Sequence, residues 1–182
     1  KLPDDGWENY TLTNRTGNKK EKWRKGGSQV RGISFEIPNN YGKYLFEILD
    51  GTNIKKLTWK IGGGESYFIE NNTLGNPLFP TTCILDGKGL QKEITKEDYY
   101  LIFVDLKGFL NKSDVREITT YQEFVESECQ FVLLLVDSSY VTIYSKDSKT
   151  IKQIFSKAIT SGYKNIEYIT DENDTRTTLI AF

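Results

Sequence analysis

The chain has 182 residues, of which 37% are hydrophobic and 27% are charged, and its formal net charge at pH 7 is −1. We expect a chain of this length and composition to fold as one domain around its own core, which excludes a disordered protein. The sequence contains no histidine, and this excludes histidine-based catalytic triads, histidine-based ribonuclease chemistry and most zinc sites.

Residues 1–30 are predicted to form a basic β-hairpin ahead of the main domain. They hold seven basic and four acidic side chains, a balance of +3, whereas residues 31–182 hold 17 basic and 21 acidic ones, a balance of −4. Large and polar side chains alternate over residues 7–13, and a turn signal follows at residues 16–18. Gly26-Gly27-Ser28 has the composition of a flexible joint, so we place a domain boundary near residue 28. The first segment is then a native extension or a foreign segment fused to an α+β domain of residues 31–182.

Alternating apolar residues predict the first strand and the first helix of the main domain. The strand covers residues 33–37 and ends at Pro38, which cannot donate a ladder hydrogen bond. A helix with apolar residues at helical spacing follows, capped by Asn39 or Asn40 and ended by Gly51.

The next stretch combines a hairpin with an irregular excursion. Residues 57–61 and 67–69 are typical of two strands joined by a loose glycine turn. Residues 71–96 are rich in Asn, Gly, Pro and Lys, and we expect a long irregular excursion there. One short strand is predicted within it, near residues 83–85.

Two nearly continuous apolar runs, residues 99–106 and 131–136, predict central strands that are covered on both faces. Between them, Thr120 and Glu123 have the spacing of a capping box, in which each side chain satisfies a backbone donor of the other residue. The box predicts a short helix. This helix is expected to bury Tyr121, Phe124 and Val125.

The last part of the chain predicts one strand, a helix and two further strands. Residues 140–144 alternate as a strand does, and residues 148–160 carry one apolar stripe that ends at Gly162. Residues 166–170 and 177–182 are predicted strands on either side of an acidic turn. The predicted fold class is therefore α+β, with a single mixed, mostly antiparallel sheet, about three helices and a preceding N-terminal β-hairpin.

The number of cysteines and the length of the apolar runs bear on whether the protein has disulfides and whether it contacts a membrane. Cys83 and Cys129 are the only cysteines, and we predict both to be reduced and structural. The longest apolar run is the length of a strand, far short of a membrane-spanning helix. We therefore expect no contact with a membrane.

Several stretches of residues 31–182 resemble an uncharacterised family of small proteins from Bacillus-like bacteria, a domain of unknown function. The stretches are residues 31–39, 41–45, 98–103, 136–144 and 167–174, with Arg176-Thr177. The family begins near Arg31-Gly32, so residues 1–30 lie outside the resemblance. The resemblance implies a bacterial, cytoplasmic setting and carries no mechanism with it.

The acidic turn is the first candidate for a functional site. Asp171, Glu172 and Asp174 concentrate carboxylates beside Arg176, and such a group can bind a hard cation or position a proton acceptor. The turn lacks the glycine and the final glutamate of a calcium-binding loop. We favour an Asx-rich turn that is bonded internally to Arg176.

The basic hairpin is the second candidate. Lys19, Lys20, Lys22 and Arg24 surround Trp23, and a basic strand with an aromatic residue can follow a phosphate backbone and stack a base. A solvated charged strand explains the same pattern, as does a piece of a partner protein. We rank nucleic-acid binding below both of these interpretations.

The functional prediction is a small protein-binding module, either an adaptor or an immunity-type inhibitor, with a protein partner. It follows from the absence of a recognisable catalytic signature and from the many Tyr and Trp residues, which suit protein-binding faces. No catalytic residue, metal or cofactor is predicted. The alternative is a histidine-free, metal-dependent nuclease or hydrolase that uses the turn at Asp171–Asp174.

Overall fold

The computed structural model describes residues 6–13, 15–79 and 81–181. The strands are β1 (Trp7–Thr13), β2 (Lys19–Lys25), β3 (Ser28–Glu36), β4 (Thr58–Ile61), β5 (Glu65–Glu70), β6 (Thr73–Pro77), β7 (Cys83–Asp86), β8 (Tyr99–Phe109), β9 (Cys129–Val136), β10 (Tyr140–Ser145) and β11 (Lys164–Thr170). The α-helices are α1 (Tyr44–Leu49), α2 (Gly87–Lys96), α3 (Tyr121–Glu126) and α4 (Ser148–Thr160), and the short 3₁₀ helices are η1 (Ile54–Lys56) and η2 (Lys112–Asp114). Within the described residues, no helix is long and apolar enough to cross a membrane.

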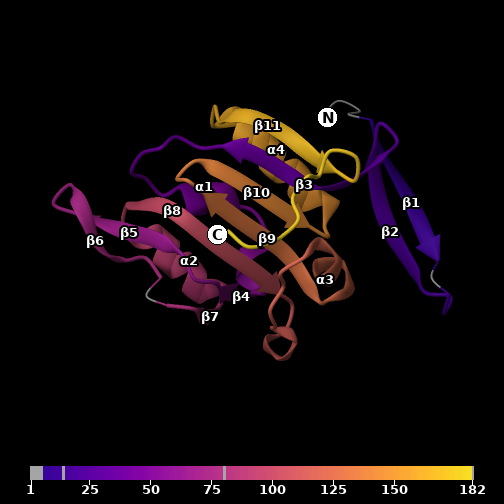
Figure 1. Cartoon of the computed structure of the whole chain (residues 1–182), viewed down its shortest axis with the longest axis horizontal. Coiled ribbons are helices and arrows are strands. Elements are labelled where there is room, and N and C mark those ends of the chain that lie inside the picture. Colours follow the sequence, from indigo (N-terminus) through magenta and orange to yellow (C-terminus); the bar gives the residue numbers. More distant parts are fainter. Residues whose placement is uncertain (1–5, 14, 80, 182) are drawn as a thin grey trace.

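The strands form a mostly antiparallel sheet in the order β1-β2-β3-β10-β9-β8-β4-β7 (Figure 1). β11 also pairs with β3, while β5 joins β8 and carries β6. Together with the four α-helices, this arrangement confirms the predicted α+β fold and its N-terminal hairpin.

The centre of the sheet is formed by the two apolar runs that were predicted as central strands. β8 and β9 pair in a register that sets Leu106 opposite Leu133 and Val104 opposite Leu135. Successive side chains of β9 point to opposite faces, and both faces are buried. α1, α2 and α4 cover one face, which lies behind the sheet in Figure 1. α3 and the C-terminal segment supply residues to the core on the other face, and this segment crosses in front of the sheet.

Local structure departs from the sequence prediction at the first helix. α1 begins at Tyr44, because Gly42 is held in an isolated antiparallel bridge with Tyr99. Asn39 and Asn40 therefore do not cap it, and that part of the prediction is wrong.

The stretch at residues 71–96 is also more regular than predicted. The short strand near residue 83 is confirmed as β7, but β6 and the ten-residue α2 occupy most of the rest. The carboxylate of Asp86 caps α2 by accepting a hydrogen bond from the Gly89 N–H, with N and Oδ1 2.7 Å apart. The helix then buries Leu90 and Ile94.

The predicted strand at residues 177–182 is wrong for the described residues 177–181. These residues are irregular, and Phe182 lies outside the described residues. The Leu179 N–H donates to the carbonyl of Thr119, while the Ala181 N–H donates to the carboxylate of Asp105. Buried and exposed residues thus alternate over residues 179–181 as in a strand, although these two hydrogen bonds, and not strand pairing, hold the segment.

β1 and β2 form an arm (residues 7–25) that projects from the rest of the molecule, which we call the body (residues 28–181) (Figure 1). β1 pairs with β2 along its whole length, whereas β2 meets β3 only at Arg24 and Lys25. Gly26 and Gly27 connect β2 to β3 with φ angles of 58° and 84°. Positive φ at both positions is what a two-residue hairpin turn of type I′ requires. The glycine joint is thus a tight turn between paired residues, and the division into two domains stays a prediction.

Candidate functional site

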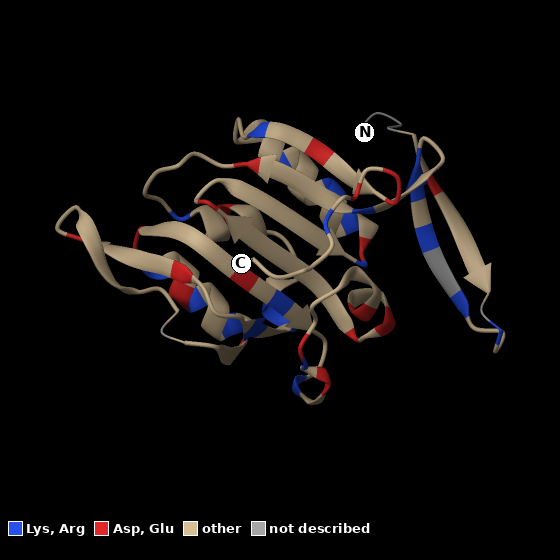
Figure 2. Ribbon diagram, viewed as in Figure 1, with Lys and Arg blue, Asp and Glu red and all other residues tan. Residues whose placement is uncertain are grey.

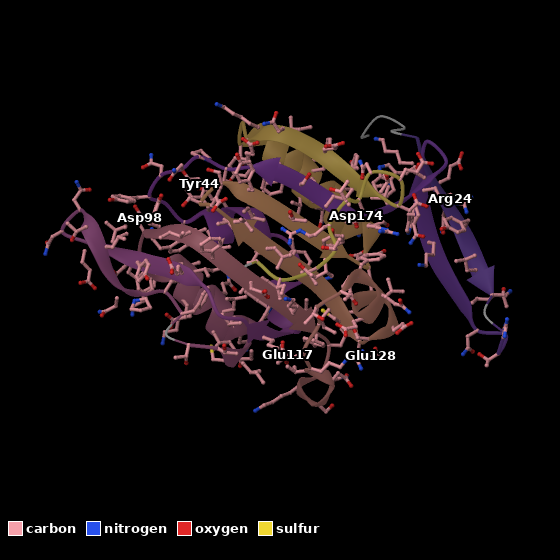
Figure 3. The ribbon with its side chains drawn as sticks, in the orientation of Figure 1. Arg24, Tyr44, Asp98, Glu117, Glu128 and Asp174 are labelled. Atoms are coloured by element: carbon pink, nitrogen blue, oxygen red, sulfur yellow. The ribbon has the colours of Figure 1, made fainter. Side chains whose placement is uncertain are left out.

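The acidic turn after β11 is built around the buried carboxylate of Asp174, whose side chain is 4% exposed. Its Oδ2 accepts a hydrogen bond from the Arg31 guanidinium at 3.1 Å, and its Oδ1 accepts one from the Tyr144 hydroxyl at 3.0 Å. Burial, and then the Asp174 charge, raise the pKa of Tyr144. Figure 3 places Asp174 within the body and Arg24 on the arm. This carboxylate links the turn to β3 and β10.

A second carboxylate of the turn, that of Asp171, also holds the backbone. Asp171 accepts a hydrogen bond from the Gln29 N–H at 2.9 Å, whereas Glu172 is exposed. The predicted bond to Arg176 exists through the backbone, because the Arg176 N–H donates to Asp174. The guanidinium of Arg176 donates instead to two carbonyls of the C-terminal segment. Among the described residues, no group of three or more His, Cys, Asp or Glu side chains could hold a metal ion.

The basic residues of the arm do not form one continuous face. Figure 2 shows basic residues along β2. Lys22 and Arg24 are two positions apart and therefore share one face of the strand, whereas Lys19 and Lys25 lie on the other face. The Arg24 guanidinium lies over the ring of Tyr10, 4.1 Å from its centroid. Lys19 is exposed, whereas Lys22 and Trp23 are half-buried. Lys20 belongs to β2 by its backbone, and its side chain lies outside the described residues.

An aromatic cluster fixes the base of the arm to the body. Trp7 packs edge-on against Tyr168 of β11, with ring centroids 5.3 Å apart, and Tyr168 stacks on Phe155 of α4 at 4.2 Å. The Lys152 ammonium of α4 lies over the rings of both Trp7 and Trp23, at 4.5 and 5.1 Å. These ring and cation contacts, rather than strand pairing, position most of the arm.

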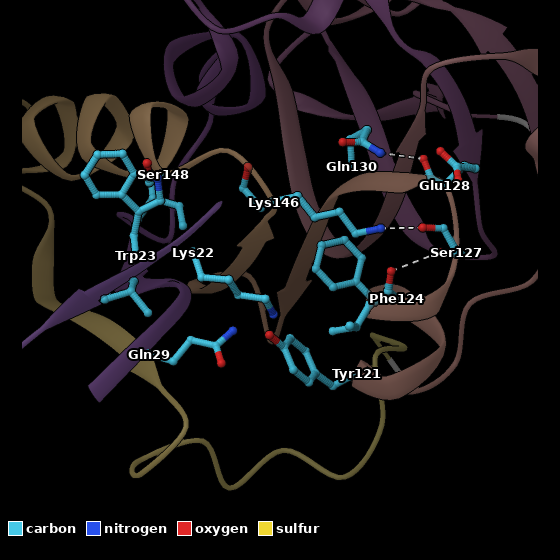
Figure 4. A pocket seen from close by; sticks show the side chains of 14 residues that line it. Lys22, Trp23, Gln29, Tyr121, Phe124, Ser127, Glu128, Gln130, Lys146 and Ser148 are labelled. Atoms are coloured by element: carbon cyan, nitrogen blue, oxygen red, sulfur yellow. Dashed lines mark hydrogen bonds between the residues drawn. The ribbon is translucent and has the colours of Figure 1, made fainter. Parts of the chain in front are cut away.

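A cavity of about 400 Å³ lies between the arm and the body, and we call it the arm groove. Lys22 and Trp23 line it from β2, and Tyr121 and Phe124 line it from α3. Figure 4 shows Lys22 and Tyr121 extending toward each other from these two sides. Because consecutive strand residues point to opposite faces, a cavity that touches both Lys22 and Trp23 must run along the edge of β2.

The body wall of the groove is held firmly. The predicted capping box is confirmed: the Thr120 hydroxyl accepts a hydrogen bond from the Glu123 N–H at 3.1 Å, and the Glu123 carboxylate accepts bonds from the backbone N–H groups of Thr119 and Thr120. These bonds, those from Thr119 first, lower the pKa of Glu123. The Lys146 ammonium lies 5.2 Å from the centroid of the Phe124 ring and donates to the carbonyl of Ser127 (Figure 4).

A second polar site lies on the front face of the sheet, and the sequence reasoning missed it. Asp105 and Lys107 of β8 are buried and paired, with Oδ1 and Nζ 2.5 Å apart. With Lys60, Gly62 and Glu117 they line a cavity of about 190 Å³. The sequence did carry a signal for this site, because an acidic and a basic residue stand two positions apart in an otherwise apolar run. Figure 2 shows this acidic and this basic residue on β8.

Comparison with known proteins identifies relatives of the body. A family model described as "Protein of unknown function (DUF2691)" matches residues 30–180. The "Uncharacterized protein YncE" of Bacillus subtilis (strain 168) is 41% identical over 150 residues, which cover 82% of this chain and 97% of that protein. No solved structure matches the chain.

Proposed function

This chain belongs to the DUF2691 family, and we propose that it is a protein-binding module that holds an extended, acidic segment of a partner protein in the arm groove. The observation that carries the proposal is the position of the groove along an incompletely paired strand edge. β3 pairs with β2 only at Arg24 and Lys25, so the β2 edge from Lys19 to Trp23 is not covered by β3. An extended peptide can add to such an edge by main-chain hydrogen bonds.

The lining of the groove fits a side chain from such a segment. Trp23, Tyr121 and Phe124 offer ring surfaces, and a volume of about 400 Å³ lies within the range of well-formed binding pockets. Peptides that extend a sheet gain affinity from the backbone and specificity from pockets that take alternate side chains.

The charge of the groove favours an acidic partner segment. Lys22 and Lys146 line it with Glu128 as the opposing charge, and further basic residues follow along β2. Opposite charge on the two partners raises the rate of encounter and disfavours wrong partners. A basic partner would be repelled by the arm.

The proposal covers an adaptor and an immunity-type inhibitor alike, acting in the bacterial cytoplasm. Cys83 and Cys129 are both free thiols, as expected in a reducing compartment. The metal-dependent nuclease stays a hypothesis without a supporting observation, because Asp171 and Asp174 are engaged in the hydrogen bonds that hold their turn.

Site-specific photo-crosslinking in a Bacillus host tests the proposal. A photoreactive residue is placed at Gln29, which lines the groove, and in a matched control at Leu74, which is exposed on β6. We expect partner adducts at position 29, joined to an acidic stretch of one protein. Equal adduct patterns at the two positions would show that the groove is not the binding surface.

Charge reversal distinguishes binding in the groove from general attraction to the positive charge of the arm. Lys22→Glu places a carboxylate in the groove, whereas Lys19→Glu makes the same change of net charge on the same strand, outside the groove lining. We expect Lys22→Glu to weaken capture of the crosslinked partner roughly tenfold and Lys19→Glu to have a much smaller effect. Equal losses would indicate attraction to the whole arm instead.

A further inference from the structure

The cavity on the front face of the sheet brings two lysines together. Lys60 of β4 and Lys107 of β8 are direct cross-strand partners, so their side chains leave the same face of the sheet. Asp105, two residues before Lys107, shares that face. Like charges directly opposite each other destabilise a sheet unless something balances them. The cavity therefore needs negative charge.

Two carboxylates supply this charge in different ways. Asp105 is fixed, because its side chain is 6% exposed, its Oδ1 accepts from Lys107, and its Oδ2 accepts from the Ala181 N–H at 3.3 Å. Glu117 forms an ion pair with Lys60, yet its own side chain is 77% exposed while that of Lys60 is 14% exposed. The ammonium is held and shielded, whereas its carboxylate partner stands in water. Figure 3 shows Glu117 at the lower rim of the sheet.

The wall beside this ion pair lacks side chains. Gly62 and Gly63 line the cavity, and the Gly62 N–H donates to the Asp105 carbonyl at 2.9 Å. A Cβ atom on Gly62 would lie 3.0 Å from both Cβ and Cγ of Asp105, which is closer than normal packing allows. Glycine at this position therefore lets the backbone lie close to Asp105, beside a cavity of about 190 Å³ that both residues line.

We propose that this cavity binds a small oxyanion, a carboxylate or a phosphate, on the ammonium of Lys60 in place of the Glu117 carboxylate. Glu117 is then a built-in competitor that neutralises the lysine when no ligand is present. The Glu117 side of this ion pair is open to water, which screens its attraction to Lys60, so exchanging one carboxylate for another costs little. When Glu117 leaves, Lys60 and Lys107 outweigh Asp105 by one charge. The volume is too small for a typical drug-sized ligand and suits an ion of a few heavy atoms.

Titration of inorganic phosphate and of malonate into the full chain, at constant ionic strength, tests the proposal and distinguishes the two kinds of oxyanion. Calorimetry or amide chemical shifts around Gly63 report binding. We expect Glu117→Gln to raise the affinity of the preferred anion about fivefold, since it removes the competing charge. Lys60→Gln should abolish binding. Glu172→Gln, an exposed change elsewhere on the surface, should leave the affinity unchanged.

A conservative variant protects the test against misfolding. Lys60→Arg retains the positive charge and should keep binding within a few fold, so a loss in Lys60→Gln can be assigned to charge. The proposal is overturned if Glu117→Gln binds no more tightly than the unmodified chain. It is also overturned if Lys60→Gln binds as well as that chain, or if no variant binds either anion at millimolar concentration.

Discussion

The arm and the body use similar strand-forming residues but are stabilised in different ways. In β1 only Trp7 and Tyr10 are half-buried and the other residues are exposed, whereas β9 is buried along almost its whole length. A two-stranded hairpin alone is marginally stable in water, because it has no second layer to pack against. The arm is ordered by ring contacts at its base, and the body is ordered by a core on each face of its sheet.

This difference bears directly on the arm groove. One wall belongs to the body and is fixed by a capping box and by the buried rings of α3 and β10. The other wall belongs to the arm and depends on Trp7, Trp23 and Lys152. A partner segment that adds to β2 would supply the neighbour that this wall lacks. Substitutions in the two regions should therefore differ in their effects.

The largest expected effect comes from the core of the body. Trp59 is 1% exposed, packs against Phe131, and donates its indole N–H to the carbonyl of Ile54 at 2.9 Å. Trp59→Ala should lower the free energy of unfolding by about 3–5 kcal/mol, measured by urea denaturation. The matched change on the arm, Leu12→Ala, should alter it by less than about 0.5 kcal/mol, because Leu12 is exposed. Similar losses would contradict the division into a stable body and a weak arm.

The next effect tests the role of the acidic turn as part of the body. Asp174→Asn removes the negative charge that Arg31 and Tyr144 share, and we expect a loss of about 2 kcal/mol, since Arg31 is partly open to solvent. Glu172→Gln, in the same turn but exposed, should leave the free energy of unfolding unchanged. If both variants are equally stable, the turn does not tie β11 to the core.

A smaller and local effect is expected at the base of the arm. Trp7→Ala should cost less than about 1 kcal/mol of global stability, because the side chain is only half-buried. It should nevertheless speed amide hydrogen exchange over residues 19–25 while leaving β9 protected. Tyr10→Ala is the control, since Tyr10 contacts Arg24 of the arm. Unchanged exchange in Trp7→Ala would mean that the aromatic cluster does not anchor the arm.

The smallest effect concerns thiol reactivity inside the body. Burial raises the pKa of Cys129 to about 11 and also raises that of the half-buried Cys83. At pH 9 alkylation of the folded chain should therefore reach Cys83 first, as peptide mapping by mass spectrometry can show. The neutral thiol of Cys129 contributes to the free energy of unfolding at pH values below the pKa that this thiol has in the unfolded chain. This contribution is lost as the pH rises through about 11. Equal rates at the two thiols would indicate that the body opens.

Much of the fold could be predicted from residues that are close together in the sequence. The arm strands, the two central strands, the capping box and α4 all follow patterns that repeat within a few positions. α2 was missed because Gly87 and Gly89 in its first turn resemble a loop. Gly87 is there for a tertiary reason, since a Cβ atom would lie 2.2 Å from the carbonyl oxygen of Ile54.

The candidate sites were less accessible to sequence reasoning. The sequence singled out Lys22 and Trp23 but did not indicate that they would line a cavity with Tyr121 and Phe124. It also marked Asp174 as a candidate functional carboxylate, whereas the fold uses it to hold Arg31 and Tyr144. In each case the role depends on a partner far along the chain.

The sequence by itself determined the α+β class, most of the strands and the absence of histidine chemistry, because these depend on composition and on periodicity over short distances. Only the tertiary structure decided that Lys60 lies opposite Lys107, and that β2 stands beside α3 with a groove between them. Strand pairing joins residues across dozens of positions, and the register that sets two side chains face to face is fixed by burial of the whole sheet.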